Sequence, residues 1–207
     1  MTKDRYNMSF TTGGLFYNES LRILGVYRKQ QDWKVTQKTA VDDNLMQART
    51  RSSAVRRVRE ICSRLKGLTD RELDLLFTGS TQEQYYLLWV SVCKNHVFIT
   101  DFATKVVREK FLRMDLVLET TDYDMFFEDM AEWHEELEQL TDSTKKKLRQ
   151  VLFKIMKEAE ILSLNNMIIP GLLTSELAIV LADDDPSWLT VLPVSDTDIQ
   201  GSLQDGL

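Results

Sequence analysis

The chain has 207 residues, a formal net charge of −6 and 43% hydrophobic residues, which suits one domain with at most a small appendage. Two cysteines, Cys62 and Cys93, are too few for a disulfide framework or a zinc site and favour a reducing compartment. The most apolar window, residues 85–93, is too short to span a bilayer, and the N-terminus lacks the apolar run of a signal peptide. We therefore expect a cytoplasmic protein with no membrane partner.

The sequence predicts a mainly helical, all-α chain, because only 8 glycines and 3 prolines are present. Apolar residues recur at helical spacing, and most such runs follow a residue that can cap a helix. The pair Ser52–Ser53 is expected to cap the third helix and Gly67 to end it. The expected helix starts lie after TTGG (residues 11–14) and at or near residues 39, 52–53, 69–70, 80–81, 100–101, 120–121 and 141–143.

The pattern changes after Leu162. MIIPGLL (residues 167–173) is expected to begin a strand or loop, TSELAIVLA (174–182) to form a short helix, and SWLTVLPV (187–194) to be extended. A helix followed by short strands would give a small winged-helix-like ending, and the polar residues from Asp196 predict a frayed tail. The expected organisation is a helical bundle over residues 1–162, a C-terminal extension over 163–195 packed on the bundle, and a tail over 196–207.

Catalytic motifs are lacking, so we expect no enzyme activity, cofactor, metal or small-molecule substrate. His96 and His134 are the two histidines, and EWHEELE around His134 lacks the second histidine of a zinc-binding HExxH helix. TTGG is not followed by the Gly-Lys-Ser/Thr of a phosphate-binding loop, and there is no GxSxG nucleophile motif. His134 is expected on a helix surface or edge.

Charges are segregated along the chain. Residues 1–66 hold 14 bases and 6 acids, a net charge of +8, whereas residues 119–140 hold 9 acids and no base. Such asymmetry is typical of proteins that bind nucleic acids or protein partners. It also arises when oppositely charged segments of one chain pair with each other, so the total charge does not decide between these possibilities.

The most basic stretch, RTRSSAVRRVREICSRLKGL (residues 49–68), is predicted to form a two-sided helix. At 100° per residue its apolar residues fall on one side and its arginines on the other, so the guanidinium groups should face outward. Arginine suits forked contacts with phosphate oxygens, and close like charges on one face repel unless an anion lies nearby. The expected phosphate contacts are Arg49, Arg51, Arg56, Arg57, Arg59 and Arg64.

A second basic cluster opens the helix that starts near Thr141. Its members are Lys145, Lys146, Lys147 and Arg149. Positive charge in the first turns of a helix opposes the helix dipole by about 0.3–1 kcal/mol per group, so stability alone would favour acids there. Both clusters therefore have two explanations, contact with a polyanion or neutralisation by the acidic residues 119–140.

Several segments in combination resemble the BrxA family, whose members are small accessory proteins of BREX bacteriophage-exclusion systems. They are MSFTTGGLFYNESLRIL, QDWKV, DDNLMQARTRSSAVRRVREICSRL, ITDFATKVVREK, LTDSTKKKLRQVLFKIMKEAEIL and IIPGLLTSEL. The resemblance covers residues 8–182 and implies a NusB-like helical fold and a non-catalytic protein that binds double-stranded DNA. The resemblance also implies that the protein acts together with other BREX components.

The leading hypothesis is a cytoplasmic DNA-binding accessory protein of a phage-defence system, which meets the phosphate backbone through both basic clusters. Double-stranded DNA is the expected nucleic acid, with RNA left open. The alternative is an adaptor that docks protein partners through its oppositely charged helices, without binding nucleic acid.

Overall fold

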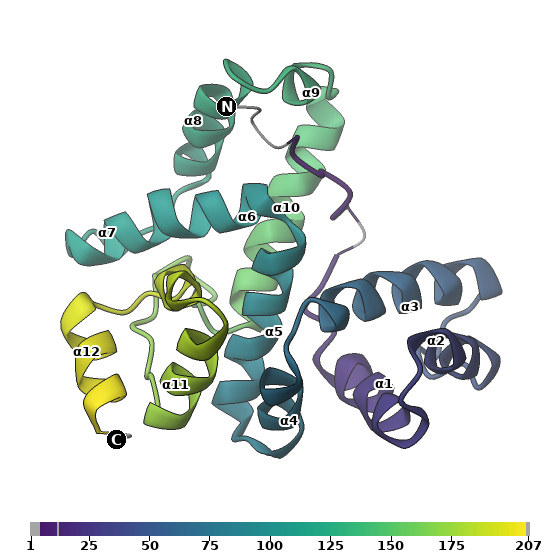
Figure 1. The fold of residues 1–207 in the computed structure, drawn as a ribbon. Helices are drawn as coiled ribbons and strands as arrows, with labels where there is room; N and C mark the ends of the chain where they lie inside the picture. Colours follow the sequence, from purple (N-terminus) through teal and green to yellow (C-terminus); the bar gives the residue numbers. More distant parts are fainter. Residues whose placement is uncertain (1–4, 12, 206–207) are drawn as a thin grey trace. The chain divides into compact units, whose positions relative to one another are not determined.

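Every regular element of the computed structural model, which describes residues 5–11 and 13–205, is a helix (Figure 1). β-type pairing in this part of the chain is confined to two isolated bridges, Val117 with Met167 and Leu162 with Ile168. The predicted all-α class is therefore confirmed. The chain divides into two compact units, which we call the N-terminal unit (Leu15–Asn95) and the C-terminal unit (Met1–Gly14 with His96–Leu207).

The N-terminal unit is a bundle of helices in which α5 packs on α3 and α4, and α1 packs on α2, α3 and α4. In α5 the residues from Tyr86 to Cys93 are all buried, which explains why this stretch is almost entirely apolar. The helices are α1 (Tyr17–Gln30), α2 (Trp33–Asp42), α3 (Arg51–Lys66), α4 (Asp70–Thr78) and α5 (Thr81–Asn95).

A buried charge pair joins α4 to α5. Thr69 and Glu72 form a capping box at the start of α4, with the Thr69 N–H donating to Glu72 at 2.7 Å. Lys94 donates to both Glu72 carboxylate oxygens, at 2.7 and 2.6 Å, and both side chains are almost fully buried. The capping box and the ion pair together satisfy the buried carboxylate, which makes the pairing of these helices specific.

The C-terminal unit contains a continuous helical run over residues 97–112, in which a π-helix joins two α-helices. The elements of this unit are α6 (Val97–Phe102), η1 (Ala103–Arg108), α7 (Glu109–Leu112), α8 (Thr120–Ala131), α9 (Glu135–Glu138), α10 (Asp142–Glu158), α11 (Ser175–Asp184), the 3-10 helix η2 (Pro186–Val191) and α12 (Asp196–Gln204).

Aromatic side chains form the centre of this unit. The Phe98 and Phe102 rings of α6 meet Tyr123 and Phe126 of α8 edge to face, with ring centroids 5.3–5.9 Å apart. The amphipathic pattern of α8 is thus explained by contact with α6. Burial, reinforced by the charge of Asp124, raises the pKa of Tyr123, so its hydroxyl stays neutral at physiological pH.

The N-terminal segment packs into the same unit. Tyr6 and Phe10 are buried, and the Tyr6 ring stacks on His134 with centroids 3.9 Å apart. The Tyr6 hydroxyl donates to Asp101 at 2.5 Å. Burial is the main cause that raises the pKa of Tyr6, and the hydrogen bond to Asp101 adds to it. His96 is fully buried, with Nδ1 3.2 Å from the Asn7 carbonyl oxygen. Both histidines are therefore buried, because this segment covers them, and the expectation of His134 at a helix surface is wrong.

Several expected helix boundaries differ from the structure. The chain divides into its two units at residues 14/15 and 95/96, because Tyr6 and Phe10 pack with the later helices. The boundary expected near residue 162 stays a prediction. The helix expected to start at residue 120 or 121 ends at Ala131, and the separate short helix α9 follows. The second and sixth helices start earlier than expected, at Trp33 and Val97, and Asp32 caps the former through bonds to two backbone N–H groups.

The C-terminal expectations were partly wrong. SWLTVLPV is largely the 3-10 helix η2, capped by Asp185 and opened by Pro186, and residues 163–195 contain none of the strands that a winged-helix ending requires. Asp196–Gln204 is helical, because Ser195 and Asp198 form a capping box. MIIPGLL is a loop with isolated bridges, and TSELAIVLA forms α11 as predicted.

Part of the expected TTGG turn, Thr12, and the last residues of the expected tail, 206–207, lie outside the described residues. In the part of the chain that is described, no helix is both long and apolar enough to span a bilayer.

Close approach of the N-terminal segment to α10 requires a glycine at position 13. A Cβ there would lie 1.9 Å from Val151 Cγ1, with two further Val151 atoms within 2.9 Å. We expect Gly13→Ala to lower the free energy of unfolding by about 1–3 kcal/mol through overpacking. Gly201→Ala is the control, since a Cβ at this helical position meets nothing within 4 Å. Urea denaturation measures both, and equal stability of the two variants would contradict the packing described.

Candidate nucleic-acid interface

Helix α3 forms because a capping residue precedes a regular apolar stripe. Its N-cap is Thr50, whose hydroxyl accepts from the Ser53 N–H at 3.2 Å, so the expected Ser52–Ser53 cap is off by two or three residues. Val58, Cys62 and Leu65 are fully buried along one side of the helix. This side holds α3 in the N-terminal unit and leaves the opposite side for the charged residues.

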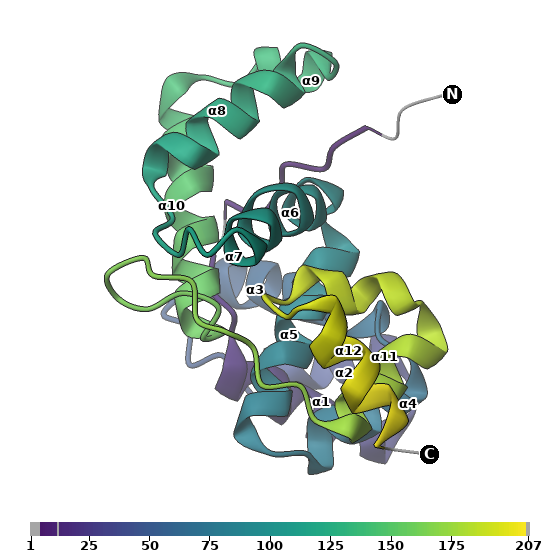
Figure 2. The same ribbon diagram turned by 90° about the vertical axis from the view of Figure 1, so that its left-hand side faces the viewer.

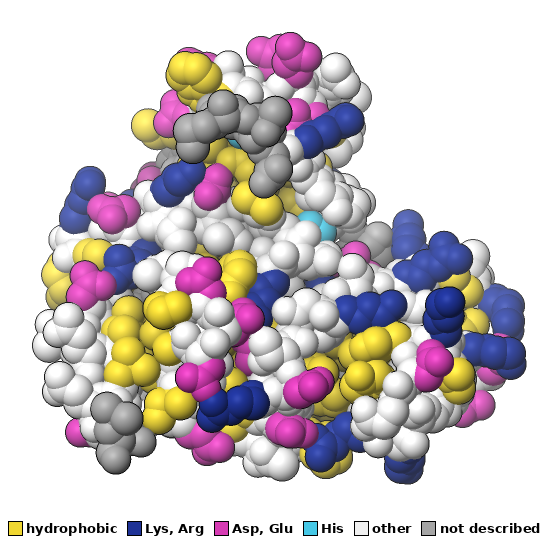
Figure 3. Space-filling view, viewed as in Figure 1, with side chains coloured by type: hydrophobic (Ala, Val, Ile, Leu, Met, Phe, Trp, Pro, Cys, Tyr) yellow, Lys and Arg dark blue, Asp and Glu magenta, His cyan; other side chains and the backbone are white. Residues whose placement is uncertain are grey.

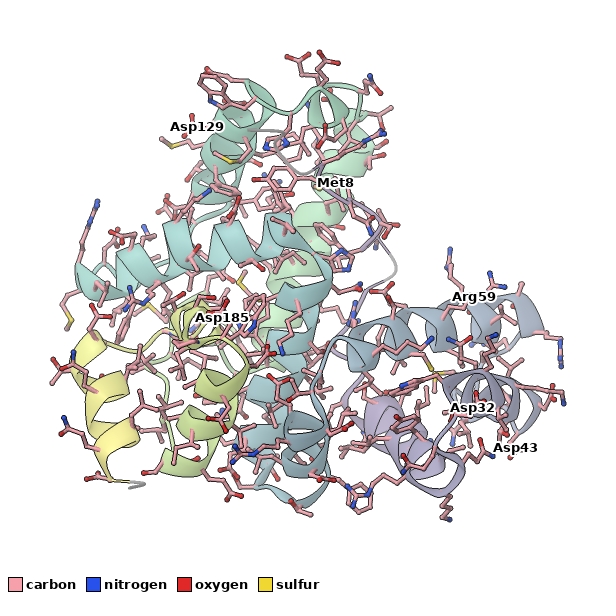
Figure 4. The ribbon with its side chains drawn as sticks, in the orientation of Figure 1. Met8, Asp32, Asp43, Arg59, Asp129 and Asp185 are labelled. Atoms are coloured by element: carbon pink, nitrogen blue, oxygen red, sulfur yellow. The ribbon has the colours of Figure 1, made fainter. Side chains whose placement is uncertain are left out.

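Arginines occupy the open side of α3 as the helical period predicts. Arg56 and Arg59 are exposed, Arg57 is half-buried, and Arg49 is exposed just before the helix. Figure 3 shows dark blue side chains gathered over α3, and Figure 4 shows Arg59 on the side of α3 away from Asp32 and Asp43. No acidic side chain within residues 15–95 pairs with these four arginines. Their charge is therefore not neutralised inside their own unit.

Arg51 is already engaged by a carboxylate. Its guanidinium donates to Asp42 at 2.8 Å, and Lys38 donates to the other oxygen of the same carboxylate at 2.7 Å. Hydrogen bonds from Lys38 and Arg51 lower the pKa of Asp42. All three side chains are solvent-exposed, so the pairing is weak and still allows Arg51 to meet a phosphate.

Arg64 does not point outward, contrary to the sequence-based expectation. Its side chain is 3% exposed, donates to Glu60 at 2.8 Å and lies over the Phe16 ring at 5.6 Å. Arg64 lies at the border of the apolar stripe in the last turns of α3, where Phe16 covers it. We assign it a structural role and leave it out of the interface.

The second basic cluster lies on α10, whose N-cap Thr141 accepts from the Thr144 N–H at 3.3 Å. Lys146 and Lys147 are exposed, whereas Lys145 is half-buried with its ammonium 5.2 Å from the Phe127 ring centre. Arg149 forms an ion pair with Asp124 of α8. The acidic segment thus neutralises one member of this cluster and leaves two lysines open.

Sequence reasoning missed the continuation of this cluster along α10. Lys154 and Lys157 share the face of Lys146, because residues 146, 150, 153, 154 and 157 recur at the helical period. A surface hollow of about 670 Å³ lies beside this face and is lined by Arg149, Gln150, Phe153, Lys154, Lys157 and Leu164, among others. The spacing from Lys146 to Lys157 is the signal that could have revealed these two residues.

The two cysteine side chains lie in the interior of the protein. Burial raises the pKa of the Cys62 thiol to about 11, so little thiolate forms near neutral pH. Cys93 is also buried. Among the described residues, no three or more His, Cys, Asp or Glu side chains are grouped so that they could hold a metal ion.

The buried position of Arg64 predicts a loss of stability that its exposed neighbour does not share. Arg64→Ala should lower the free energy of unfolding by roughly 3 kcal/mol, because it removes one partner of a mostly buried ion pair. Arg59→Ala, the matched control on the same helix, should change it by less than about 0.5 kcal/mol. Chemical denaturation followed by circular dichroism measures both changes. If the two variants are equally stable, Arg64 has no structural role.

Comparisons with known proteins agree with the resemblance seen in the sequence. The chain is 27% identical over 161 residues to "BREX protein BrxA" of Bacillus cereus (strain H3081.97), covering 77% of this chain and 80% of that protein. It is 26% identical over 147 residues to "BREX protein BrxA" of Escherichia coli O9:H4 (strain HS), covering 71% and 69%.

The structure is similar to the crystal structure of an uncharacterized protein from Magnetospirillum magneticum, with a TM-score of 0.77 and 22% sequence identity. The match covers 92% of this chain and 98% of that one, so the two proteins share a fold. The model of the BrxA family matches residues 4–185. This match spans most of the chain, which belongs to the BrxA family.

Proposed function

We propose that this chain is a non-catalytic, cytoplasmic accessory protein of a BREX phage-defence system that binds double-stranded DNA. The observation that carries the proposal is the arginine face of α3, with Arg49 just before the helix. Arg49, Arg56, Arg57 and Arg59 have no acidic partner within their unit. Both curated relatives are named as BrxA proteins of BREX systems, which supports the assignment to phage defence and to work beside other BREX components.

Electrostatics explain why α3 favours a polyanion. Arginines at neighbouring positions of one helix face repel each other, at a cost of roughly tenths of a kcal/mol per pair. Phosphate oxygens relieve that repulsion and accept forked hydrogen bonds from guanidinium groups. The net charge of −6 opposes a general attraction to DNA, so binding depends on local basic surfaces such as α3 and α10.

Contacts of this kind position DNA without reading its sequence. Guanidinium and ammonium groups that meet phosphates carry no base information, so we expect weak sequence preference from α3. RNA presents the same phosphate charge, and a parallel titration with duplex RNA tests whether the protein distinguishes the two.

A second candidate function is the docking of a protein partner by the acidic segment over α8 and α9. Met125 and Trp133 are 65% and 66% exposed there, with Glu128, Asp129 and Glu132 exposed beside them. Exposed apolar side chains rimmed by charge are typical of protein interfaces. Failure to bind duplex DNA at low salt would favour this adaptor role over the DNA-binding one.

Removal of two exposed arginines from α3 tests the leading proposal. The double variant Arg56→Ala/Arg59→Ala should bind all duplex sequences more weakly, and the slope of log affinity against log salt should shrink by about 2. Fluorescence anisotropy with labelled duplex DNA at several salt concentrations measures both quantities.

The control is Lys105→Ala/Arg113→Ala, which removes the same charge from exposed side chains of the C-terminal unit. It should leave the slope unchanged. If both double variants lose affinity equally, the effect is one of net charge, and α3 is not the interface.

A further inference from the structure

A rigid turn follows α10 and carries an unusually exposed apolar side chain. The Ser163 N–H donates to the Met167 carbonyl oxygen at 2.8 Å, and the Asn166 N–H donates to the Ser163 carbonyl oxygen at 3.0 Å. The Ser163 hydroxyl accepts from the Met167 N–H at 3.0 Å. These bonds close a short hairpin at the bridge between Leu162 and Ile168.

A third segment fixes the base of this hairpin. The Leu118 N–H donates to the Asn166 carbonyl oxygen at 2.9 Å, and the Ile168 N–H donates to the Leu116 carbonyl oxygen at 2.7 Å. Leu162 and Ile168 are each 2% exposed, so the base is also anchored in the core. The tip is thus held at a defined place, and Figure 2 shows the loop after α10 projecting from the helices of its unit.

Leu164 at the tip is 86% exposed, the largest exposed fraction among the large exposed hydrophobic side chains of the described residues. Asn165 next to it is also exposed. A single exposed leucine is common and by itself indicates nothing. Its surroundings are informative here, because the same turn is tied to the cationic face of α10.

Cations flank the tip on the α10 side. Lys157 donates to the Leu164 carbonyl oxygen at 3.1 Å, and Leu164 lines the hollow with Arg149 and Lys154. The cations of this face run from Lys146 to Lys157 over about 16 Å of helix, at 1.5 Å per residue. Lys146 and Lys154 are exposed, with Lys154 3.6 Å from Glu158, and Lys157 is half-buried. That length covers several consecutive phosphates of a DNA strand. A strand held there would bring the adjacent groove to the tip.

We infer that Leu164 enters the minor groove of duplex DNA bound along α10 and wedges against a base step, with Asn165 at the groove floor. This inference rests on the proposed function. Minor-groove proteins commonly insert an apolar side chain between base pairs while cations hold the flanking phosphates. A tip of two residues suits the minor groove, about 6 Å wide, better than the major groove, about 12 Å wide. The Asn165 amide can donate to the acceptors that A·T pairs present there.

The test compares the wild-type chain with Leu164→Ser and with Leu172→Ser. Leu172 is the matched control, since it is 76% exposed in the same unit and does not line the hollow. The probe is a short duplex with 2-aminopurine at a central TA step, because such steps unstack and kink readily. Anisotropy of an end label reports binding, and 2-aminopurine fluorescence reports unstacking in the same samples.

The expected result is a fluorescence rise on binding by the wild type and Leu172→Ser, and its loss in Leu164→Ser. The affinity of Leu164→Ser for DNA should fall by less than about tenfold. The variant loses the apolar contact with the bases, but it no longer has the free-energy cost of unstacking them. Binding without a fluorescence rise in the wild type, or an equal rise in all three proteins, would overturn the inference and leave the proposed function intact. No anisotropy change with any protein would reject both.

Discussion

Burial of the apolar side of α3 determines which charges of the chain can meet a ligand. Val58, Cys62 and Leu65 are removed from water entirely, and the helix cannot rotate without exposing them. The opposite side, with Arg56 and Arg59, must then face solvent. The orientation of these guanidinium groups is a consequence of core packing and needs no ligand to establish it.

The guanidinium groups of α3 serve two purposes. Arg64 is enclosed by Glu60 and Phe16 and contributes to the fold, whereas Arg59 is open to solvent. On α10 the division is similar, since Arg149 pairs with Asp124 and Lys146 stays exposed. Counting basic residues therefore overstates the surface available to phosphates, and burial and pairing decide which residues belong to it.

Local signals in the sequence predicted much of the fold. Capping residues such as Thr69 and Thr141 and the apolar stripes placed most helices, because both act within a few residues of the chain. The division into two units was not predictable in this way, since it depends on Tyr6 and Phe10 packing among helices that follow residue 96. The burial of Arg64 depends on Phe16, almost fifty residues away in sequence, and helical spacing alone could not show it.

Modification of arginines by phenylglyoxal, with and without saturating duplex DNA and read residue by residue by mass spectrometry, tests the central claim most directly. We predict that DNA protects Arg49, Arg56 and Arg59, while Arg113, which is 76% exposed outside both basic clusters, is modified equally in both samples. Equal modification of the α3 arginines with and without bound DNA would contradict it.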